Sequence, residues 1–190
     1  VGMLTPEQIA TRLDDRFKLL TGGSRTALPR QQTLRSLIDW SYNLLADNER
    51  RLLRWLAVFS GGWNLGALSA IAARFGSGRA IHEDIYTERG VLELLGALIS
   101  KSLVAVEHTS PTQSRFRLLE PLREYLLQEL AASGDAELVR NCHLDYYAAY
   151  AQDMGASLHR ERSRDAHAHL AQDAENFRTA LRWSLARGRI

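Results

Sequence analysis

The fold is decided by residues 88–125, which have the sequence ERGVLELLGALISKSLVAVEHTSPTQSRFRLLEPLREY. In residues 88–101 the apolar side chains recur at helical spacing. From Leu103 the residues alternate as in a strand, residues 109–112 have turn-forming composition, and residues 115–118 make a second short strand. A helix followed directly by a β-hairpin is the order of elements in a winged helix, so the sequence predicts that fold.

Upstream of this stretch the sequence predicts short helices in series, as in a helix-turn-helix core. The first is expected over residues 5–20, and the glycine-bearing residues 21–32 are expected to form a loop. Thr33 is expected to cap a second helix, and a third begins at about Glu49. A fourth helix is expected over residues 65–75, because a glycine pair and a capping asparagine precede it.

The chain downstream of the hairpin is expected to be helical throughout. One helix begins at Glu120-Pro121, with proline in its first turn, and ends at Ser133-Gly134. Two longer helices follow, each with one regularly spaced apolar face. These faces comprise Val139, Cys142, Tyr146 and Tyr150 in one helix and Leu170, Phe177, Leu181 and Leu185 in the other. The expected fold class is therefore mainly α: a winged-helix core with a small β-hairpin, followed by a long antiparallel helical hairpin.

The composition fits a globular chain in a reducing compartment. The 190 residues are 45% hydrophobic, yet no stretch approaches the roughly 18 to 20 uncharged apolar residues that a membrane-spanning helix needs. The N-terminal residues lack the features of a secretory signal, and Cys142 has no second cysteine to pair with. We therefore expect a cytoplasmic protein that does not enter a membrane.

Charge and patterning argue against a direct reading of DNA. The net charge is only +2, whereas proteins that neutralise nucleic-acid phosphates usually have a larger basic excess. The helix before the hairpin, which would enter the major groove, has basic residues only at its ends, Arg89 and Lys101. Its apolar stripe is expected to be covered by protein and to form an intramolecular interface. The residues predicted for this interface are Val91, Leu94, Leu95 and Leu98.

No catalytic or metal-binding pattern is present in the sequence. The glycine pairs lack the Lys-Ser/Thr that completes a phosphate-binding loop, and the histidines have no metal-ligand spacing. Cys142 and His143 are adjacent in a helix, so their side chains point about 100° apart and do not form a nucleophile and base pair. We therefore expect neither a catalytic residue nor a metal site, and no enzymatic activity from this chain alone.

Five motifs, in order, resemble one particular family. They are LPRQQTLR at 28–35, DWSYNLL at 39–45, LAVFSGG at 56–62, LISKSLV at 98–104 and RLLEPLREY at 117–125. Together they are similar to the bacterial signal-transduction ATPases with numerous domains, or STAND proteins. These proteins combine a nucleotide module like that of NB-ARC proteins with a winged helix and helical repeats, and many are transcriptional regulators.

The resemblance implies a division of the chain into three parts. Residues 1–30 would end the small helical domain of the nucleotide module and include a linker, residues 31–132 would form the winged-helix domain, and residues 133–190 would form a helical hairpin leading into a TPR-like sensor region. The phosphate-binding loop would precede residue 1. ATP or ADP with Mg²⁺ is therefore expected in the parent protein, and no cofactor is expected in this segment.

The resemblance also points to residues near a bound nucleotide. Eukaryotic relatives carry a Met-His-Asp motif, whose histidine contacts the nucleotide phosphate, where the second hairpin strand meets the next helix. This motif aligns with residues 118–120, but Leu119 cannot donate a hydrogen bond to phosphate. The candidates near the nucleotide are therefore Leu119 and Glu120 themselves, and the arginines that could substitute: Arg30, Arg35, Arg117 and Arg123.

The function expected from these observations is regulatory. The winged helix would pack against the N-terminal nucleotide-binding module of the same chain and relay its nucleotide state to the C-terminal helices. One alternative is a winged-helix domain that binds DNA. The other is a helical protein-interaction module whose C-terminal helices hold a partner through four aromatic residues, Tyr146, Tyr147, Tyr150 and Trp183.

Overall fold

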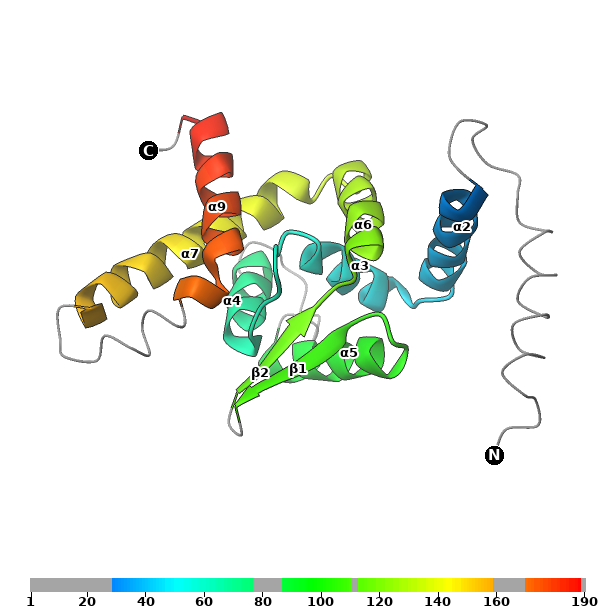
Figure 1. Ribbon diagram of the computed structural model, residues 1–190, viewed down its shortest axis with the longest axis horizontal. Coiled ribbons are helices and arrows are strands. Elements are labelled where there is room, and N and C mark those ends of the chain that lie inside the picture. Colours follow the sequence, from blue (N-terminus) through cyan, green and yellow to red (C-terminus); the bar gives the residue numbers. More distant parts are fainter. Residues whose placement is uncertain (1–28, 77–86, 111–112, 159–169, 189–190) are drawn as a thin grey trace. The chain divides into compact units, whose positions relative to one another are not determined.

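The computed structural model describes residues 29–76, 87–110, 113–158 and 170–188. The chain divides into two units, residues 1–45 and 46–190. It is mainly helical, with one two-stranded antiparallel sheet among the described residues (Figure 1). The arrangement in the second unit is that of a winged helix followed by two long helices, which confirms the expected fold class. Within the described residues, no helix is both long enough and apolar enough to cross a membrane.

The described part of the first unit is helix α2, Pro29–Asn43. The prediction of a loop up to residue 32 and a cap at Thr33 was wrong, because the helix already begins at Pro29. Proline suits the first turn of a helix, where its missing N–H costs nothing and its φ is already helical. The helix predicted over residues 5–20 lies outside the described residues.

The second unit opens with three helices, α3 (Asp47–Leu56), α4 (Leu65–Gly76) and α5 (Glu88–Ser100). At the start of each helix, a side chain accepts a hydrogen bond from the backbone. The Glu49 carboxylate accepts a hydrogen bond from the Ala46 N–H at the start of α3, and the Asn64 side chain accepts one from the Ala67 N–H in α4. In α5 the hydroxyl of Thr87 accepts from the Gly90 N–H. Such bonds satisfy backbone donors that have no partner inside the helix, and the expected helices over 65–75 and 88–101 are confirmed.

Helix α5 ends in a tight turn, and the first strand therefore begins later in the sequence than predicted. Ser102 has a φ of 59°, its N–H bonds to the Ile99 carbonyl, and the N–H of Leu103 bonds back to the Leu98 carbonyl. This pair of bonds is the Schellman pattern, which satisfies the last carbonyls of a helix. Leu103 is therefore part of the helix terminus, and strand β1 runs from Ala105 to Ser110 rather than from Leu103 as predicted.

The hairpin pairs β1 with β2 (Gln113–Arg117) in antiparallel register, with Val106 opposite Phe116. A third segment joins it from far upstream in the sequence. Trp63 and Phe116 exchange two backbone hydrogen bonds, of 2.9 and 2.8 Å. The sequence predicted the hairpin but not this bridge, which fastens the loop between α3 and α4 to the edge of β2.

Three further helices are bounded within the described residues: α6 (Glu120–Ala132), α7 (Ala136–Leu158) and α9 (Ala174–Ala186). Helices α7 and α9 run in opposite directions, since Phe177 lies against Tyr147 whereas Arg187 pairs with Glu137 at the other end. Figure 1 shows α9 crossing α7, and α4 packs against α7. The expected antiparallel pair is present, and the residues predicted to join it lie outside the described part of the chain.

The apolar face predicted for α9 was wrong in part. Leu181 and Leu185 are 60% and 55% exposed. The buried positions of this helix are Asn176, Ala180 and Ser184. A helix normally turns its apolar stripe toward the core, but in α9 the buried positions are polar or small, and the aromatic contacts with α7 come from half-buried Phe177.

Candidate functional site

A buried polar cluster joins the winged helix to the two long helices, and we call it the junction. It consists of the side chains of Ser60, Arg115, Arg123, Asp173 and Asn176 together with the backbone carbonyls of Phe59 and Gly62. These groups come from the loop between α3 and α4, from β2, from α6 and from the start of α9. Elements more than fifty residues apart in the sequence therefore meet at one polar site.

Arg115 is the centre of the junction. It projects from β2, and only 8% of it is exposed. Its guanidinium donates to Asp173 Oδ1 at 3.0 Å and to the carbonyls of Gly62 and Gln172 at 3.2 and 3.1 Å. The Asp173 carboxylate is also buried, so the positive charge of Arg115 and the negative charge of Asp173 are paired away from solvent. Removing either partner alone would leave an unpaired buried charge, which is far more costly than the pair is stabilising.

Asn176 adds the second set of bonds. Its amide donates to the Gly62 carbonyl at 2.7 Å and to Asp173 Oδ1 at 3.2 Å, and its Oδ1 accepts from the Ser60 N–H at 2.7 Å. The residue is fully buried. Because a buried amide is costly unless its donors and acceptors are used, these bonds specify how α9 meets the loop.

Arg123 extends the junction to α6. Its Nε donates to the Phe59 carbonyl at 2.7 Å, and its Nη2 donates to Ser60 Oγ at 2.9 Å. The Ser60 hydroxyl is also 3.0 Å from the hydroxyl of Thr179 in α9. One serine in the loop thus connects the helix after the hairpin with the last helix of the chain. A third bond joins Arg123 Nη1 to Glu120 at 3.0 Å.

The glycine at position 62 lets the loop lie close against the hairpin. Its φ is +97°, and a Cβ built at this position would be 2.7 Å from the carbonyl oxygen of Phe116. A side chain is excluded by both the backbone conformation and the contact. Gly62 also offers its carbonyl to Arg115 and Asn176, so the close approach of the backbone shapes the junction.

An aromatic layer beside the junction holds α9 against α7. The ring of Phe177 packs edge-on against Tyr147 at 5.2 Å and stacks with Tyr150 at 5.8 Å. The Tyr147 hydroxyl donates to Asp173 Oδ1 at 3.4 Å. Burial first, and then the nearby carboxylate of Asp173, raise the pKa of Tyr147 well above its usual range. Aromatic pairs of this geometry contribute beyond the area they bury.

The four aromatic residues predicted to bind a partner make contacts within the chain. Tyr147 is buried, and Tyr146 and Tyr150 form part of the same stack. Trp183 donates from Nε1 to Asn141 Oδ1 at 2.9 Å and lies between the guanidinium groups of Arg140 and Arg187. The aromatic side chains are occupied in packing α9 on α7, and Tyr147 in particular is not accessible.

His143 lies buried on α7 between the aromatic layer and Phe59, whose ring meets the imidazole at 5.4 Å. Burial is the main reason that the pKa of His143 is lowered to about 4, so the imidazole is neutral at physiological pH. Its Nε2 has no hydrogen-bond partner. Cys142 beside it is buried as well, and no group of His, Cys, Asp or Glu in the described residues could hold a metal ion.

The residues predicted near a nucleotide belong to both units, and four of them, Arg117, Leu119, Glu120 and Arg123, lie in the second. Arg35 is exposed on α2, and the side chain of Arg30 is outside the described residues. Arg117 pairs with Glu107 across the hairpin at 2.7 Å, and both side chains are about half exposed. Leu119 is 59% exposed. Among the four in the second unit, Glu120 and Arg123 form an ion pair, and Arg123 belongs to the junction.

The predicted interface on α5 is largely internal to the second unit. Val91, Leu95 and Leu98 are buried, and α5 packs against α3 and α4. The stripe is covered by protein, as expected, but its cover is the unit's own core. These three residues are therefore unavailable to a nucleotide module. Leu94 is only partly buried.

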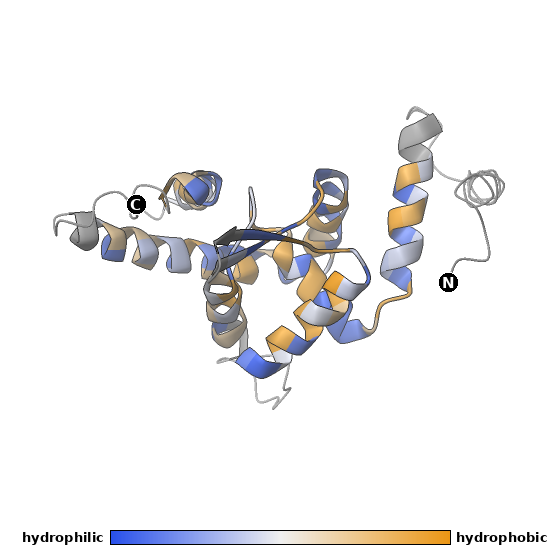
Figure 2. Cartoon of the chain, turned by 60° about the horizontal axis from the view of Figure 1, so that its bottom comes forward, coloured by the Kyte–Doolittle hydropathy of each residue, from blue (hydrophilic) through white to orange (hydrophobic). Residues whose placement is uncertain are grey.

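The outer face of α5 carries little free positive charge. Arg89 forms an ion pair with Glu93 at 2.9 Å, and Lys101 contacts both oxygens of Glu49 at 2.5 and 2.6 Å. Figure 2 shows a hydrophilic first turn followed by a mostly hydrophobic ribbon. The exposed residues between the two basic ends include an apolar leucine, a glutamate and a glycine: Leu92, Glu93 and Gly96.

Sequence reasoning missed the junction. Of its members, only Arg123 was a predicted site residue, as a candidate near the nucleotide; Ser60, Arg115, Asp173 and Asn176 were not predicted. Buried asparagine and aspartate resemble solvated helix-start residues in a sequence. The one available signal was the position of Asn176 between Asp173 and Ala180 on a single helical face.

Comparison with known proteins aligns the whole chain with a segment of longer proteins that are named as regulators. It is 41% identical over 190 residues to a protein of Mycobacterium tuberculosis named as an HTH-type transcriptional regulator, and equally to one of Mycobacterium bovis with the same description. The chain is homologous to a segment of these regulators. The match includes all of this chain but 20% of each relative, so the chain spans about a fifth of their length.

A second protein of Mycobacterium tuberculosis, described as uncharacterized, is 35% identical over 136 residues, which is 72% of this chain and 32% of that protein. No family model matches the chain. No solved structure matches it.

Proposed function

We propose that this chain is a regulatory winged-helix segment that relays a conformational change by intramolecular packing and does not itself read DNA. The proposal rests on the burial and the charge pairing of helix α5. Its apolar stripe is buried in the unit's own core, and the cations at its two ends are paired with carboxylates.

Reading base edges requires free donors and acceptors on the helix that enters the major groove. In α5 the exposed face carries Glu88 and Glu93, which repel phosphates, and an exposed leucine. The arginines of β2 do not compensate, because Arg115 is buried with Asp173 and Arg117 is paired with Glu107. A segment with this surface is poorly suited to the phosphate backbone.

The junction supports the relay. Its buried ion pair and hydrogen bonds join the hairpin and α6 to the start of α9, so a displacement of the winged helix is transmitted to the long helices without a flexible link. Packed and fully bonded interfaces move as rigid bodies between discrete arrangements. We therefore expect the winged helix and the α7–α9 pair to move together.

The source of the displacement follows from the motif resemblance to STAND proteins. We propose that the parent protein binds ATP or ADP with Mg²⁺ in an N-terminal NB-ARC-like module, and that this chain responds to the nucleotide state without catalysing a reaction. Exposed residues on α6 and at its start remain available for that contact, among them Leu119 and Glu120.

A binding selection tests whether the chain reads DNA. The full chain is incubated with a pool of random duplexes, and the bound fraction is sequenced at several salt concentrations. We expect no enriched sequence and only weak binding that falls steeply with salt. An enriched sequence whose affinity drops in the Arg89→Gln variant would overturn the proposal in favour of a DNA-binding winged helix.

Limited proteolysis of the parent protein tests the relay. With ADP and with a non-hydrolysable ATP analogue, we expect different protection at residues 20–35 and 100–125 and a linked change in α7 and α9. Arg115→Met should break the link while leaving the first change in place, and Arg117→Met, on the same strand but in an exposed pair, should not. Identical protection with the two nucleotides would contradict the relay.

A second candidate function is a protein-interaction surface on the C-terminal helices. It is favoured by three leucines exposed on α7 and α9: Leu138, Leu181 and Leu185. Capture of a partner by the full chain that is lost when Leu181 and Leu185 are both replaced by serine would support it, and it would not require any response to nucleotide.

A further inference from the structure

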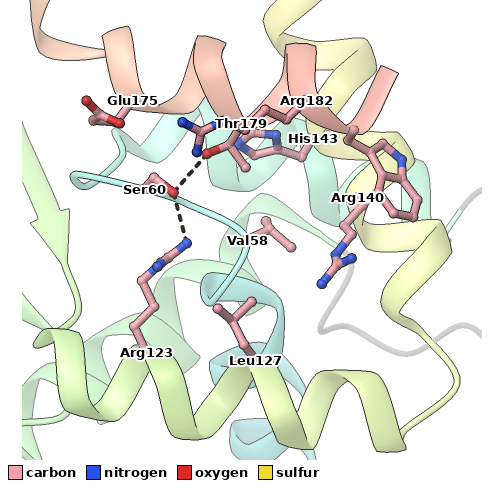
Figure 3. A pocket seen from close by; sticks show the side chains of 10 residues that line it. Val58, Ser60, Arg123, Leu127, Arg140, His143, Glu175, Thr179 and Arg182 are labelled. Atoms are coloured by element: carbon pink, nitrogen blue, oxygen red, sulfur yellow. Dashed lines mark hydrogen bonds between the residues drawn. The ribbon is translucent and has the colours of Figure 1, made fainter. Parts of the chain in front are cut away.

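A pocket of about 400 Å³ opens beside the junction, between α6, α7 and α9 (Figure 3). Two side chains of the junction, Ser60 and Arg123, form part of its lining. Its volume lies in the range of pockets that hold small molecules. The proposed transmission of movement through the junction does not require a pocket between these helices.

Three arginines from three helices line this pocket: Arg123 of α6, Arg140 of α7 and Arg182 of α9. In Figure 3, Arg123 rises from α6 toward Ser60, and Arg140 extends from α7 on the other side of the same space. Arg123 is held by Glu120 and by the loop. Arg123 and Arg140 are half-buried and Arg182 is exposed, so three separate helices each contribute one cation to the lining of the same pocket.

Two of these arginines have no carboxylate partner within the described residues. Arg140 contacts only the ring of Trp183, at 5.0 Å. Arg182 makes no hydrogen bond or ion pair in that part of the chain. The single carboxylate that lines the pocket, Glu175, is paired with Arg178. The lining therefore has a positive excess that the protein does not neutralise.

The rest of the lining suits an organic group with a planar or apolar body. Val58 and Leu127 form an apolar wall, and Trp183, whose ring contacts the guanidinium groups of Arg140 and Arg187, also lines the pocket. Hydroxyls from Ser60 and Thr179 lie at the same pocket. The buried His143 also lines it, and its Nε2 has no partner. An unpartnered buried nitrogen is costly unless a ligand or water satisfies it.

We infer that this pocket binds a small organic anion, a phosphate or carboxylate carried on a planar or apolar body, with Arg140 and Arg182 as its principal contacts. Guanidinium groups bind both kinds of anion through paired N–H donors. A ligand at this position touches α6, α7 and α9 together, so its binding is coupled to the packing of the winged helix on the long helices. This site does not depend on the proposed response to nucleotide.

Isothermal titration calorimetry with the full chain tests the inference. The probes are phenyl phosphate, benzoate and the neutral benzyl alcohol, each at low salt. We expect saturable binding of at least one of the two anions and at least tenfold weaker binding of the alcohol. A preference for phenyl phosphate or for benzoate identifies the acidic group that the pocket favours.

Variants locate the binding. Arg140→Gln and Arg182→Gln should each weaken binding of the preferred anion about tenfold, because each removes one charge-assisted contact. Arg89→Gln removes an exposed arginine on α5 and should change nothing. Circular dichroism confirms that the variants are folded. Failure of both anions to bind, or equal affinity in all three variants, would overturn the inference.

Discussion

At the scale of single residues, the contribution of several side chains to the stability of the fold depends on their surroundings. Gly62, Arg115 and His143 are ordinary in the sequence, and each is constrained by burial or by close backbone contact in the structure. Their substitution should therefore cost far more than that of the same residue type elsewhere in the chain.

Gly62→Ala should destabilise the fold by about 3 kcal/mol, because the new Cβ would have to displace the Phe116 carbonyl and the backbone would keep its positive φ. Gly61→Ala is the matched control. Gly61 has a φ of +76°, but its nearest contact would be at 3.6 Å, so only about 1 kcal/mol of backbone strain is expected. Chemical denaturation measures both, and equal losses would show that the contact with Phe116 is unimportant.

His143 should make the chain less stable as the pH falls from about 6.5 toward 4. Burial lowers the pKa of the folded-state imidazole from 6.5 to about 4, so in this window the unfolded chain binds a proton that the folded chain does not. Stability is therefore complete above pH 6.5 and declines on acidification, by about 3 kcal/mol in total. His143→Phe should remove this part of the pH dependence, as measured by denaturation at pH 7 and at pH 4.5. An unchanged slope would contradict the prediction.

At the scale of elements, helix α9 differs most from its sequence pattern. The leucines that mark an amphipathic stripe are exposed, whereas the buried face carries Asn176, Ala180 and Ser184. The buried amide and the small residues allow the helix to approach the loop and α7 closely. Leu181 and Leu185 are left for a surface that the described residues do not cover.

This orientation of α9 can be checked with neighbouring substitutions. Ala180→Leu should destabilise by about 1–3 kcal/mol, because the added side chain has no space in a buried position. Leu181→Ala, one residue along, should change stability by less than about 0.5 kcal/mol, because that side chain is exposed. Thermal denaturation of the two variants distinguishes the faces, and the reverse order of effects would mean that the helix is rotated.

At the scale of the whole molecule, the junction determines whether the winged helix and the long helices behave as one body. Its members are separated by up to 116 residues in the sequence. A coupled network of this kind makes unfolding of the second unit cooperative across the hairpin and α9. Through the same network, binding of an anion in the pocket or a displacement of the winged helix would change the packing of α7 and α9.

A double-mutant cycle on Arg115 and Asp173 measures this coupling. Arg115→Met and Asp173→Asn should each cost about 3–5 kcal/mol, and the double variant should cost much less than their sum, because neither charge is then left unpaired. The same cycle on Arg117 and Glu107, an exposed pair on the hairpin, should give less than about 1 kcal/mol. Additive effects at Arg115 and Asp173 would show that the two halves are not coupled through this pair.

The sequence by itself determined the local elements of this protein. Caps, proline and glycine positions and the change from helical to alternating spacing act over a few residues, so they placed α4, α5, α6 and the hairpin close to their observed bounds. The motif resemblance agreed with the homology to transcriptional regulators at the level of class.

Tertiary structure alone decided which residues meet. Pairing of Arg115 with Asp173, the bridge of Trp63 to Phe116 and the inward turn of Asn176 all join segments far apart in the sequence. Such contacts leave no periodic trace, because a buried polar residue has the same chemical identity as a solvated one. Its role depends on the partners that folding brings within hydrogen-bond distance.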